Sequence, residues 1–502
     1  MDLVLRGPSI RDRLRANVAP SDAEKNAIVQ ALDTAEARLS ILQAGCLASA
    51  ARSTEEATLA TFVAEYSSIL SKIRQLPDDI LRLIFLHPDI HDHLFTGYTG
   101  RSSVVAPETW HIASVCSHWR AILLDMPVWW SCISTSVTGG QVCVSRLQLF
   151  LRRSMNAPLS ITLIREDQHE TTPPPNPEIV QALTREAGRW QHLLMSNGPD
   201  LTSLPLGGCF PLLESLVLAS TDGLEKIVHA PKLRAVSFRH IYHAQLEAIA
   251  NLPTRPILRL SAHIGSGHLC QSLLSLFPDT IHLTISTNNK TAWRGLPGPH
   301  PHFSVRTLVF LGNEMRVYCV LEMLNVLNLP NLERLELIGC WKWDFPSVDS
   351  HMKRSGCTLK ELLLQSTRIR GPELLELLRI LPTLETLEIA GPYQIPNSIT
   401  DPVLLGLGPT DKGLLPALTK WVLHGTYVFS TNTLLNMLEY RFGPDKRCRT
   451  PTIIDIILRD RSFSAVDLQR FAALPATNAR ISLECFDEDR QWVRICNGRW
   501  WR

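Results

Sequence analysis

Apolar residues in the first 75 positions recur at helical spacing in two successive stretches. Across residues 21–46 they step alternately by four and three positions, which is the spacing of a heptad seam. A second stretch continues this spacing over residues 59–73, and Ser53 with Glu56 forms a capping-box pattern that starts a helix. We predict two helices, joined around residues 48–52, that fold back as a hairpin and bury their own stripe. An oligomerising coiled coil is the alternative, although about three heptads per helix is short for a free dimer.

The stretch after the hairpin combines a helix start with large apolar side chains. Leu76 and Pro77 precede two acidic residues, and carboxylates favour the positive N-terminal end of a helix dipole. Four apolar residues then recur at helical spacing: Ile80, Leu81, Ile84 and Phe85. Residues 91–110 are rich in Gly, Ser and Thr and predict a loop.

A second helical pattern follows that loop. Its apolar face carries Ile112, Val115, Cys116, Trp119 and Ile122. Met126 and Pro127 end this pattern, and residues 128–133 predict a strand or irregular segment. Large side chains are numerous for a core of about 60 residues. We therefore predict an exposed apolar patch here, and such patches usually mark binding sites.

From residue 189 onward, a loose frame of the form P-x-L-x-x-L-x-L recurs at intervals of roughly 20 to 35 residues. The clearer copies begin at Phe210, Ala230, Phe277, Phe303, Leu329, Gly356, Leu381 and Leu415. Looser copies begin at Arg189, Arg255, Pro451 and Pro475. Alternating leucines place one face of a short strand inward, and stretches such as VLEMLNVLNLP or GPELLELLRILP supply a returning helix. Stacked units share a core that one unit cannot form alone, so we predict a solenoid with a parallel sheet along a concave surface. A different α/β arrangement is the alternative.

Composition limits the class of protein. The chain has 502 residues, of which 45% are hydrophobic and 20% charged, and this composition is globular. The formal net charge of +2 implies no strong attraction to nucleic acid or anionic lipid. We expect no signal peptide and no membrane span, because no sufficiently long apolar run occurs. The 12 cysteines form no C-x-x-C pair, so we expect a reduced cytoplasmic or nuclear setting.

Motifs for catalysis or cofactor binding do not occur in the sequence. It contains no phosphate-binding glycine loop, no G-x-S-x-G and no H-E-x-x-H. Cys116 and His118 stand two apart on a helix and point in different directions. His300 and His302 lie in a proline-rich loop without further metal ligands nearby. We therefore expect no catalytic residues, no metal and no cofactor.

Two further segments each allow two interpretations. The proline-rich stretch at residues 173–177 predicts a surface loop, with a short linear ligand as the alternative. The C-terminal segment contains three tryptophans and a basic end, which we expect to cover the last unit of the solenoid. An exposed binding patch is the alternative for this segment.

The segment Leu76-Pro77-Asp78-Asp79-Ile80-Leu81, then Ile84-Phe85, then Val115-Cys116 and Trp119-Arg120 resembles the F-box. The usual F-box pattern is L-P-x-E-I-L-x-x-I-F followed by V-C-x-x-W-R. The flanking helical arm, S-x-I-R-x-L-P, M-P-x-x-W and R-R-S-x-x-x-P-L-S-I are similar to large fungal F-box families. Asp79 stands where Glu is more usual, and the loop at residues 91–110 is longer than the minimal connection.

The resemblance implies docking on the Skp adaptor of cullin-RING ubiquitin ligases. The contacts that it implies are Leu76, Pro77, Ile80, Leu81, Ile84, Phe85, Val115, Cys116, Trp119 and Arg120. For Phe85, Trp119 and Trp129, packing inside the F-box explains the residue at least as well as contact with the adaptor. Many F-box proteins read their targets with leucine-rich repeats, although the usual repeat asparagine does not recur here.

The resulting expectation is an α/β protein: a helical hairpin and a three-helix F-box unit, followed by a degenerate leucine-rich-repeat solenoid, or horseshoe. The expected parts are a flexible N-terminus (1–20), the arm (21–73), the F-box (74–133), a connecting segment (134–188) and the repeats (189–502). The resemblance implies a substrate-recognition subunit that binds an unidentified target protein and supplies no catalytic group. A non-degradative repeat scaffold with a relict F-box, and an oligomer driven by the arm, are the alternatives.

Overall fold

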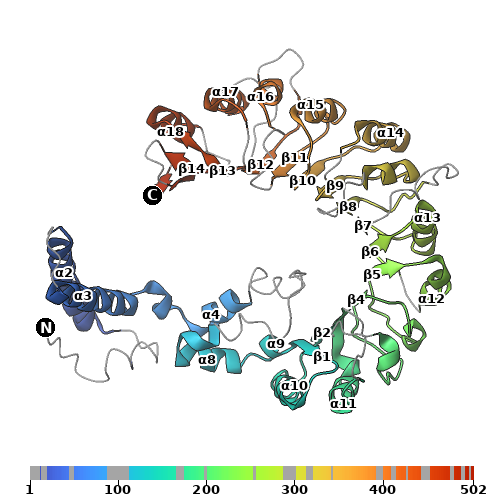
Figure 1. Ribbon diagram of the computed structural model, residues 1–502, viewed down its shortest axis with the longest axis horizontal. Coiled ribbons are helices and arrows are strands. Elements are labelled where there is room, and N and C mark those ends of the chain that lie inside the picture. Colours follow the sequence, from blue (N-terminus) through green and yellow to red (C-terminus); the bar gives the residue numbers. More distant parts are fainter. Residues whose placement is uncertain are drawn as a thin grey trace. The chain divides into compact units, whose positions relative to one another are not determined.

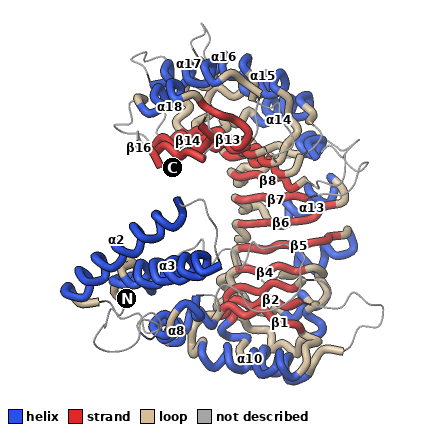
Figure 2. Tube along the Cα trace, turned by 60° about the vertical axis from the view of Figure 1, so that its left-hand side comes forward, coloured by secondary structure: helices blue, strands red, loops and turns tan. Residues whose placement is uncertain are grey.

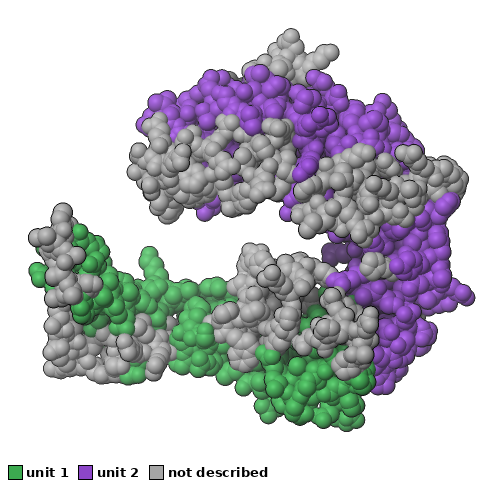
Figure 3. Space-filling view, in the orientation of Figure 1, with its two compact units in different colours: residues 1–199 green, residues 200–502 purple. Residues whose placement is uncertain are grey.

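The computed structural model describes residues 12, 20–44, 50–86, 112–164, 174–196, 200–252, 256–286, 301–312, 320–340, 343–391, 399–408, 414–425, 428–442, 453–474, 480–487, 492–496 and 499–501. The chain divides into two compact units, Met1–Pro199 and Asp200–Arg502, which Figure 3 shows in different colours. The predicted loop at residues 91–110 lies outside the described residues, as does His300 of the proline-rich loop.

The first unit begins with the helical hairpin that the heptad seam predicts. Helix α2 (Asp22–Ala44) and helix α3 (Ala50–Ile69) pack along two clusters of buried residues. The clusters are Ile28, Leu32, Tyr66 and Ile69, and then Ala35, Leu42 and Leu59. The start of α2 therefore packs against the end of α3, which makes the pair antiparallel. Within the described residues, the hairpin buries its own seam, so no second chain is needed to cover it.

Two predicted helix boundaries in the hairpin are wrong. The second helix begins at Ala50 and not at Ser53, because alanines extend a helix readily. It ends at Ile69 and does not continue to residue 73, where a 3-10 turn, η1 (Lys72–Gln75), follows. The guanidinium of Arg74 reaches back over this turn and donates to the carbonyl of Ser68 at 2.7 Å.

The remainder of unit 1 contains short helices and a parallel sheet. Its elements are α4 (Asp78–Phe85), α8 (Ser117–Leu124), α9 (Pro127–Trp130), β1 (Cys132–Ser136), α10 (Gln141–Arg153), β2 (Leu159–Ile164), α11 (Pro177–Arg185), η2 (Ala187–Arg189) and β3 (Trp190–Met195). Strand β2 pairs in parallel with both β1 and β3, and the register aligns the buried residues Ile133, Ile161 and Leu193. The segment predicted as strand or irregular at 128–133 is a short helix first, because Pro127 opens a helical turn before β1.

The second unit is a succession of strands with helices between them (Figures 1 and 2). Its elements are η3 (Leu201–Ser203), β4 (Ser215–Leu218), η4 (Leu224–Lys226), β5 (Ala235–Ile241), η5 (His243–Gln245), α12 (Leu246–Ala250), β6 (Arg259–Ile264), α13 (Gly267–Leu276), β7 (His282–Ser286), β8 (Thr307–Leu311), η6 (Val320–Val326), β9 (Arg334–Ile338), α14 (Phe345–Ser355), β10 (Glu361–Gln365), α15 (Gly371–Arg379), β11 (Thr386–Ala390), α16 (Asp401–Leu407), β12 (Lys420–Gly425), α17 (Thr431–Phe442), β13 (Ile453–Phe463), α18 (Ala465–Ala472), β14 (Arg480–Asp487), β15 (Trp492–Cys496) and β16 (Arg499–Trp501).

Strands β4 to β14 pair in parallel in chain order, and β15 and β16 add two antiparallel strands beside β14. Every copy of the repeated frame from residue 210 onward ends in one of these strands. The two antiparallel strands occupy the edge of β14, where the C-terminal segment was predicted to cover the solenoid. The side chains of its three tryptophans lie outside the described set.

The frame leucines form the core of this unit, as the alternation predicts. Leu308, Leu335, Leu362, Leu387 and Trp421 occupy the same register position on β8 to β12, and each is at most 2% exposed. Figure 1 shows helices α12 to α18 on one side of these strands. Unit 2 is therefore an open, mostly parallel α/β sheet whose apolar rows are shared between neighbouring strands. That arrangement is compatible with a solenoid.

Long cationic side chains in unit 2 donate hydrogen bonds to backbone carbonyls that do not take part in strand pairing. Arg441 is 3% exposed and donates to the carbonyls of Leu407 and Leu415 at 2.8 and 2.9 Å, and also to that of Leu414. Lys226 and Arg354 do the same for earlier loops. Lys226 donates to Leu201, Thr202 and Leu204, and Arg354 to Leu324 and Leu327. Each cation satisfies several backbone acceptors at once and so ties one strand–helix unit to the preceding one.

Candidate docking surface on helix α4

Helix α4 begins at Asp78, so Pro77 precedes the helix and does not lie in its first turn as predicted. Pro77 is the N-cap, and its carbonyl accepts the first helical hydrogen bond from the N–H of Leu81 at 3.0 Å. Asp78 and Asp79 occupy the first turn, where their carboxylates interact favourably with the helix dipole. The helix has eight residues, which gives it an inward face and an outward face of about two turns each.

The inward face carries Leu81 and Phe85, which are four positions apart and 0% and 1% exposed. The ring of Phe85 packs edge-on against the indole of Trp119 at 5.1 Å and against that of Trp129 at 6.5 Å between centroids. Such T-shaped contacts stabilise aromatic clusters beyond the burial of their area. These residues are therefore the core that joins α4 to α8 and α9.

Helix α8 is positioned by a cysteine cap. Cys116 is extended, 4% exposed, and its Sγ accepts a hydrogen bond from the N–H of Trp119 at 3.4 Å. The predicted single helix through residues 112–122 is therefore interrupted at Cys116, and residues 112–115 form a separate helical turn. Arg120 ties the two parts together, because its Nε donates to the carbonyl of Ala113 at 2.9 Å.

Two polar side-chain contacts connect α4 with α8. Arg82 contacts Asp125 at 2.6 Å, and His118 contacts Asp78 at 3.1 Å, at the opposite end of the helix. All four side chains are at least 33% exposed, so each pair contributes little to stability. Their effect is on orientation: they hold α4 so that its inward residues stay against Trp119.

The outward face of α4 is apolar and exposed. Ile80 and Ile84 are each 39% exposed, and Leu83 is 64% exposed. Pro77 is exposed, Leu76 is half-buried, and Val115 on the neighbouring turn is 56% exposed. A cluster of this kind on so short a helix marks an interaction surface. We call Leu76, Pro77, Ile80, Leu83 and Ile84 the α4 face.

The ten residues predicted from the motif thus fall into a buried group and an exposed or half-buried group. Leu81, Phe85 and Cys116 are buried in unit 1, and Trp119 is half-buried against Phe85. Five others are exposed or half-buried on the outside: Leu76, Pro77, Ile80, Ile84 and Val115. Arg120 is exposed and holds Ala113. Leu83 was missed, although its place opposite Leu81 and Phe85 follows from 100° of rotation per residue.

Across the described ranges, no group of three or more His, Cys, Asp or Glu side chains is placed to hold a metal ion. In that same part of the chain, no helix has both the length and the apolar character needed to cross a membrane. Burial raises the pKa of the Cys132 thiol to about 11 and that of Cys270 to about 12, so both remain protonated at neutral pH.

The fold and the site together define an α/β protein of two units. The first unit has an exposed apolar helix face, and the second has an open, mostly parallel sheet. Comparison with known proteins adds no closer assignment. No family model matches the chain, and the curated proteins contain no match to its sequence.

Proposed function

We propose that this protein is an F-box substrate-recognition subunit of a Skp-cullin-F-box ubiquitin ligase. The observation that carries the proposal is the α4 face: a helix opened by Leu76-Pro77 that presents Ile80, Leu83 and Ile84 to solvent while its other face is buried. Recognition of a helix in an apolar groove needs such anchors at helical spacing. The Skp adaptor would cover these side chains.

The same proposal assigns unit 2 to target binding, as a degenerate leucine-rich-repeat array. Its support is the regular alternation of inward leucines across β8 to β12 and the parallel order of the strands. The catalytic contribution would be positional. Holding a target near a charged E2 enzyme raises the effective concentration of the target lysine at the reacting thioester. No residue of this chain takes part in the chemistry.

The compartment that fits this proposal is the cytoplasm or nucleus. Among the described cysteines, Cys116, Cys132, Cys143, Cys209, Cys270, Cys357 and Cys496 are free thiols. Unpaired thiols of this number accord with a reducing environment, where cullin-RING ligases would act.

Co-purification with the Skp adaptor tests the proposal. We expect Leu76→Ala with Pro77→Ala to lower adaptor binding at least tenfold, because the pair sets the entry of α4 and supplies part of its outer face. Circular dichroism should show that the double variant keeps its helix content. Unchanged binding by a folded double variant would sink the adaptor assignment.

A second measurement separates a ligase receptor from a scaffold that binds the adaptor without degrading anything. Proteins captured by unit 2 should have a longer half-life in cells that carry the double variant than in cells that carry the original chain. A half-life that does not depend on Leu76 and Pro77 would indicate the scaffold.

A further inference from the structure

Among the described elements of unit 2, the helices α12 to α18 cover one face of the sheet and none covers the other. On β4 to β13, buried residues alternate with half-buried or exposed ones. Because successive side chains of a strand lie on opposite faces of the sheet, the second set lies on the face opposite α12 to α18, and we call it the open face. The parallel register aligns the open-face residues into rows across the strands. The charges in these rows are distributed unevenly along the sheet.

The open face of β4 to β8 is basic and rich in hydroxyl groups. Arg259 on β6 and His282 on β7 are in register and exposed. The adjacent row consists of Ser237, Ser261 and Thr284, also in register. Among the described strand residues of β4 to β8, this face has no carboxylate. Arginine and hydroxyl groups in this arrangement suit a carboxylate or phosphate.

The permanent cations on this part of the open face are Arg259 on β6 and Arg239 on β5, since His282 is not a permanent cation. Burial, together with Arg259 on β6 and Arg334 on β9, lowers the pKa of His282 against the opposing effect of Glu336. The side chain in register on β8 is the uncharged Thr307. His282 is therefore neutral near pH 7, and an acidic group docked beside Arg259 would favour its protonation.

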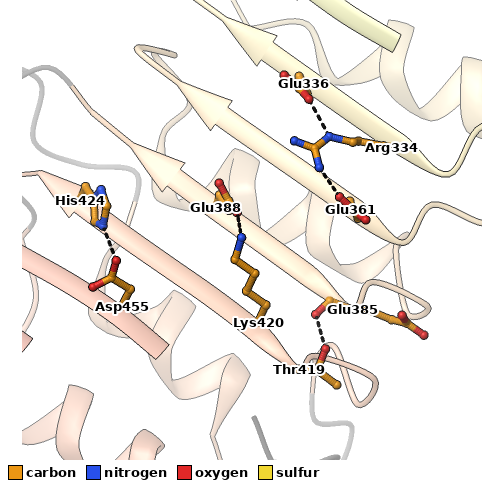
Figure 4. A network of polar contacts seen from close by, with 9 residues as sticks. All are labelled: Arg334, Glu336, Glu361, Glu385, Glu388, Thr419, Lys420, His424 and Asp455. Carbon is orange, nitrogen blue, oxygen red and sulfur yellow. Dashed lines mark hydrogen bonds and ion pairs between the residues drawn. The ribbon is translucent and has the colours of Figure 1, made fainter. Parts of the chain in front are cut away.

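The open face of β9 to β13 has the opposite character (Figure 4). Four carboxylates lie on this face, those of Glu336, Glu361, Glu388 and Asp455, beside the cations Arg334 and Lys420. Asp455 contacts His424 at 3.3 Å. Arg334 bridges Glu336 at 2.6 Å and Glu361 at 2.5 Å, and Lys420 pairs with Glu388. Both cations are thus already bound to carboxylates of this face. The face keeps an excess of negative charge and of oxygen acceptors.

The middle row of this face alternates between apolar and acidic side chains from one strand to the next. In register from β8 to β13 it runs Val309, Glu336, Leu363, Glu388, Val422 and Asp455. Strand spacing therefore separates successive carboxylates by about 10 Å, with a half-buried apolar side chain between them. An extended chain covers that distance in about three residues.

We propose that the open face binds an extended segment of a target protein that is acidic or phosphorylated at one end and basic along the rest. The acidic end would lie over β6 and β7 beside Arg259, and Lys or Arg side chains would reach Glu336, Glu388 and Asp455. This proposal rests on the proposed role of unit 2 in target binding, and it specifies the class of target. A polymer of uniform negative charge, such as a nucleic acid, would be repelled by β9 to β13.

The distance between the basic and the acidic strands determines the length of the peptide probe. From β6–β7 to β11 is about 22 Å along the strand ladder, or roughly seven extended residues. We would use fluorescein-labelled peptides of about 15 residues with an acidic block and a basic block separated by that span, in both orders. Companion peptides carry phosphoserine in the acidic block, or glutamine in place of every charge. Fluorescence anisotropy with the full chain at low salt measures binding while screening is weak.

Substitutions that change the charge of open-face residues test whether the peptide binds to that face. We expect Arg259→Glu to weaken binding of the better bipolar peptide about fivefold, and Glu336→Gln with Glu388→Gln to weaken it by a similar factor. Arg379→Glu, a matched reversal of an exposed residue on α15, should bind as the original chain does. Tighter binding of the phosphoserine peptide than of the glutamate peptide would identify phosphate as the preferred acid, and the reverse a carboxylate.

Three outcomes would overturn the proposal: equal binding of the uncharged peptide, binding by the open-face variants that matches the original chain, or no binding of either bipolar peptide up to about 1 mM. Adaptor co-purification is unaffected by any of them. A failure here therefore leaves the adaptor assignment standing, and a failure of adaptor binding leaves the peptide result interpretable.

Discussion

Phe85→Ala is expected to lower the free energy of unfolding of unit 1 by about 3–5 kcal/mol. Phe85 is 1% exposed and joins Trp119 and Trp129 through edge-on ring contacts, so truncation removes the aromatic centre of the α4–α8–α9 core. The cavity left behind would be lined by the large indoles of Trp119 and Trp129, which limits how far the site can collapse. Urea unfolding followed by tryptophan fluorescence measures the loss.

Ile84→Ala is the matched comparison, one residue away on the same helix. Its side chain is 39% exposed, so we expect a loss below about 1 kcal/mol. The contrast between the two variants distinguishes the inward and outward faces of α4. Comparable losses for Phe85 and Ile84 would mean that both faces are packed within this chain, and the α4 face would then offer no docking surface.

Acidification is expected to destabilise unit 2 through His351 on α14. This side chain is 0% exposed, and burial, with the nearby Arg354, lowers its pKa to about 4. Its Nδ1 donates to the carbonyl of Leu327 at 3.1 Å, while Nε2 is buried and has no hydrogen-bond partner in the described part of the chain. Protonation would place a positive charge in this buried site, which the carbonyls of Leu327 and Leu324 offset only in part.

Proton linkage determines how the free energy of unfolding changes with pH. The unfolded chain binds a proton at His351 below about pH 6.5, whereas the folded chain resists it down to about pH 4. The stabilisation is therefore complete above pH 6.5 and is lost as the pH falls through this window, by about 3 kcal/mol in total. His351→Gln keeps an N–H donor for Leu327 and removes the titration. Urea midpoints of the two proteins should converge between pH 6.5 and 4, and parallel curves would contradict the account.

The strands of unit 2 were predictable because their signal is local. Each inward leucine lies two residues from the next, and the frame that contains Leu335 and Leu337 specifies β9 without any knowledge of its neighbours. The sequence pattern did not determine the type of each returning helix. The stretch GPELLELLRILP forms α15, but VLEMLNVLNLP forms the 3-10 helix η6. Propensity alone does not distinguish these two outcomes.

The direction of each apolar residue on α4 was not predictable from the motif. Ile80, Leu81, Ile84 and Phe85 have similar hydropathy, and only the placement of Trp119 and Trp129 shows that Leu81 and Phe85 are the buried pair. The role of Arg441 was also invisible, because the carbonyls that it binds come from residues 26 to 34 positions earlier in the chain. Such features arise from tertiary contacts that no local pattern encodes.

The measurement that tests the central claim most directly is the affinity of the purified chain for the Skp adaptor by isothermal titration calorimetry. The variants are Ile80→Glu with Ile84→Glu on the α4 face, and Val142→Glu as a control. Val142 lies in the first turn of α10 and is 72% exposed, so the control places the same kind of charge on an exposed apolar site elsewhere in unit 1. We predict that the control binds like the original chain and that the double variant, still folded, loses at least a hundredfold in affinity. Equal affinity of all three proteins would contradict the assignment of the α4 face as the docking surface.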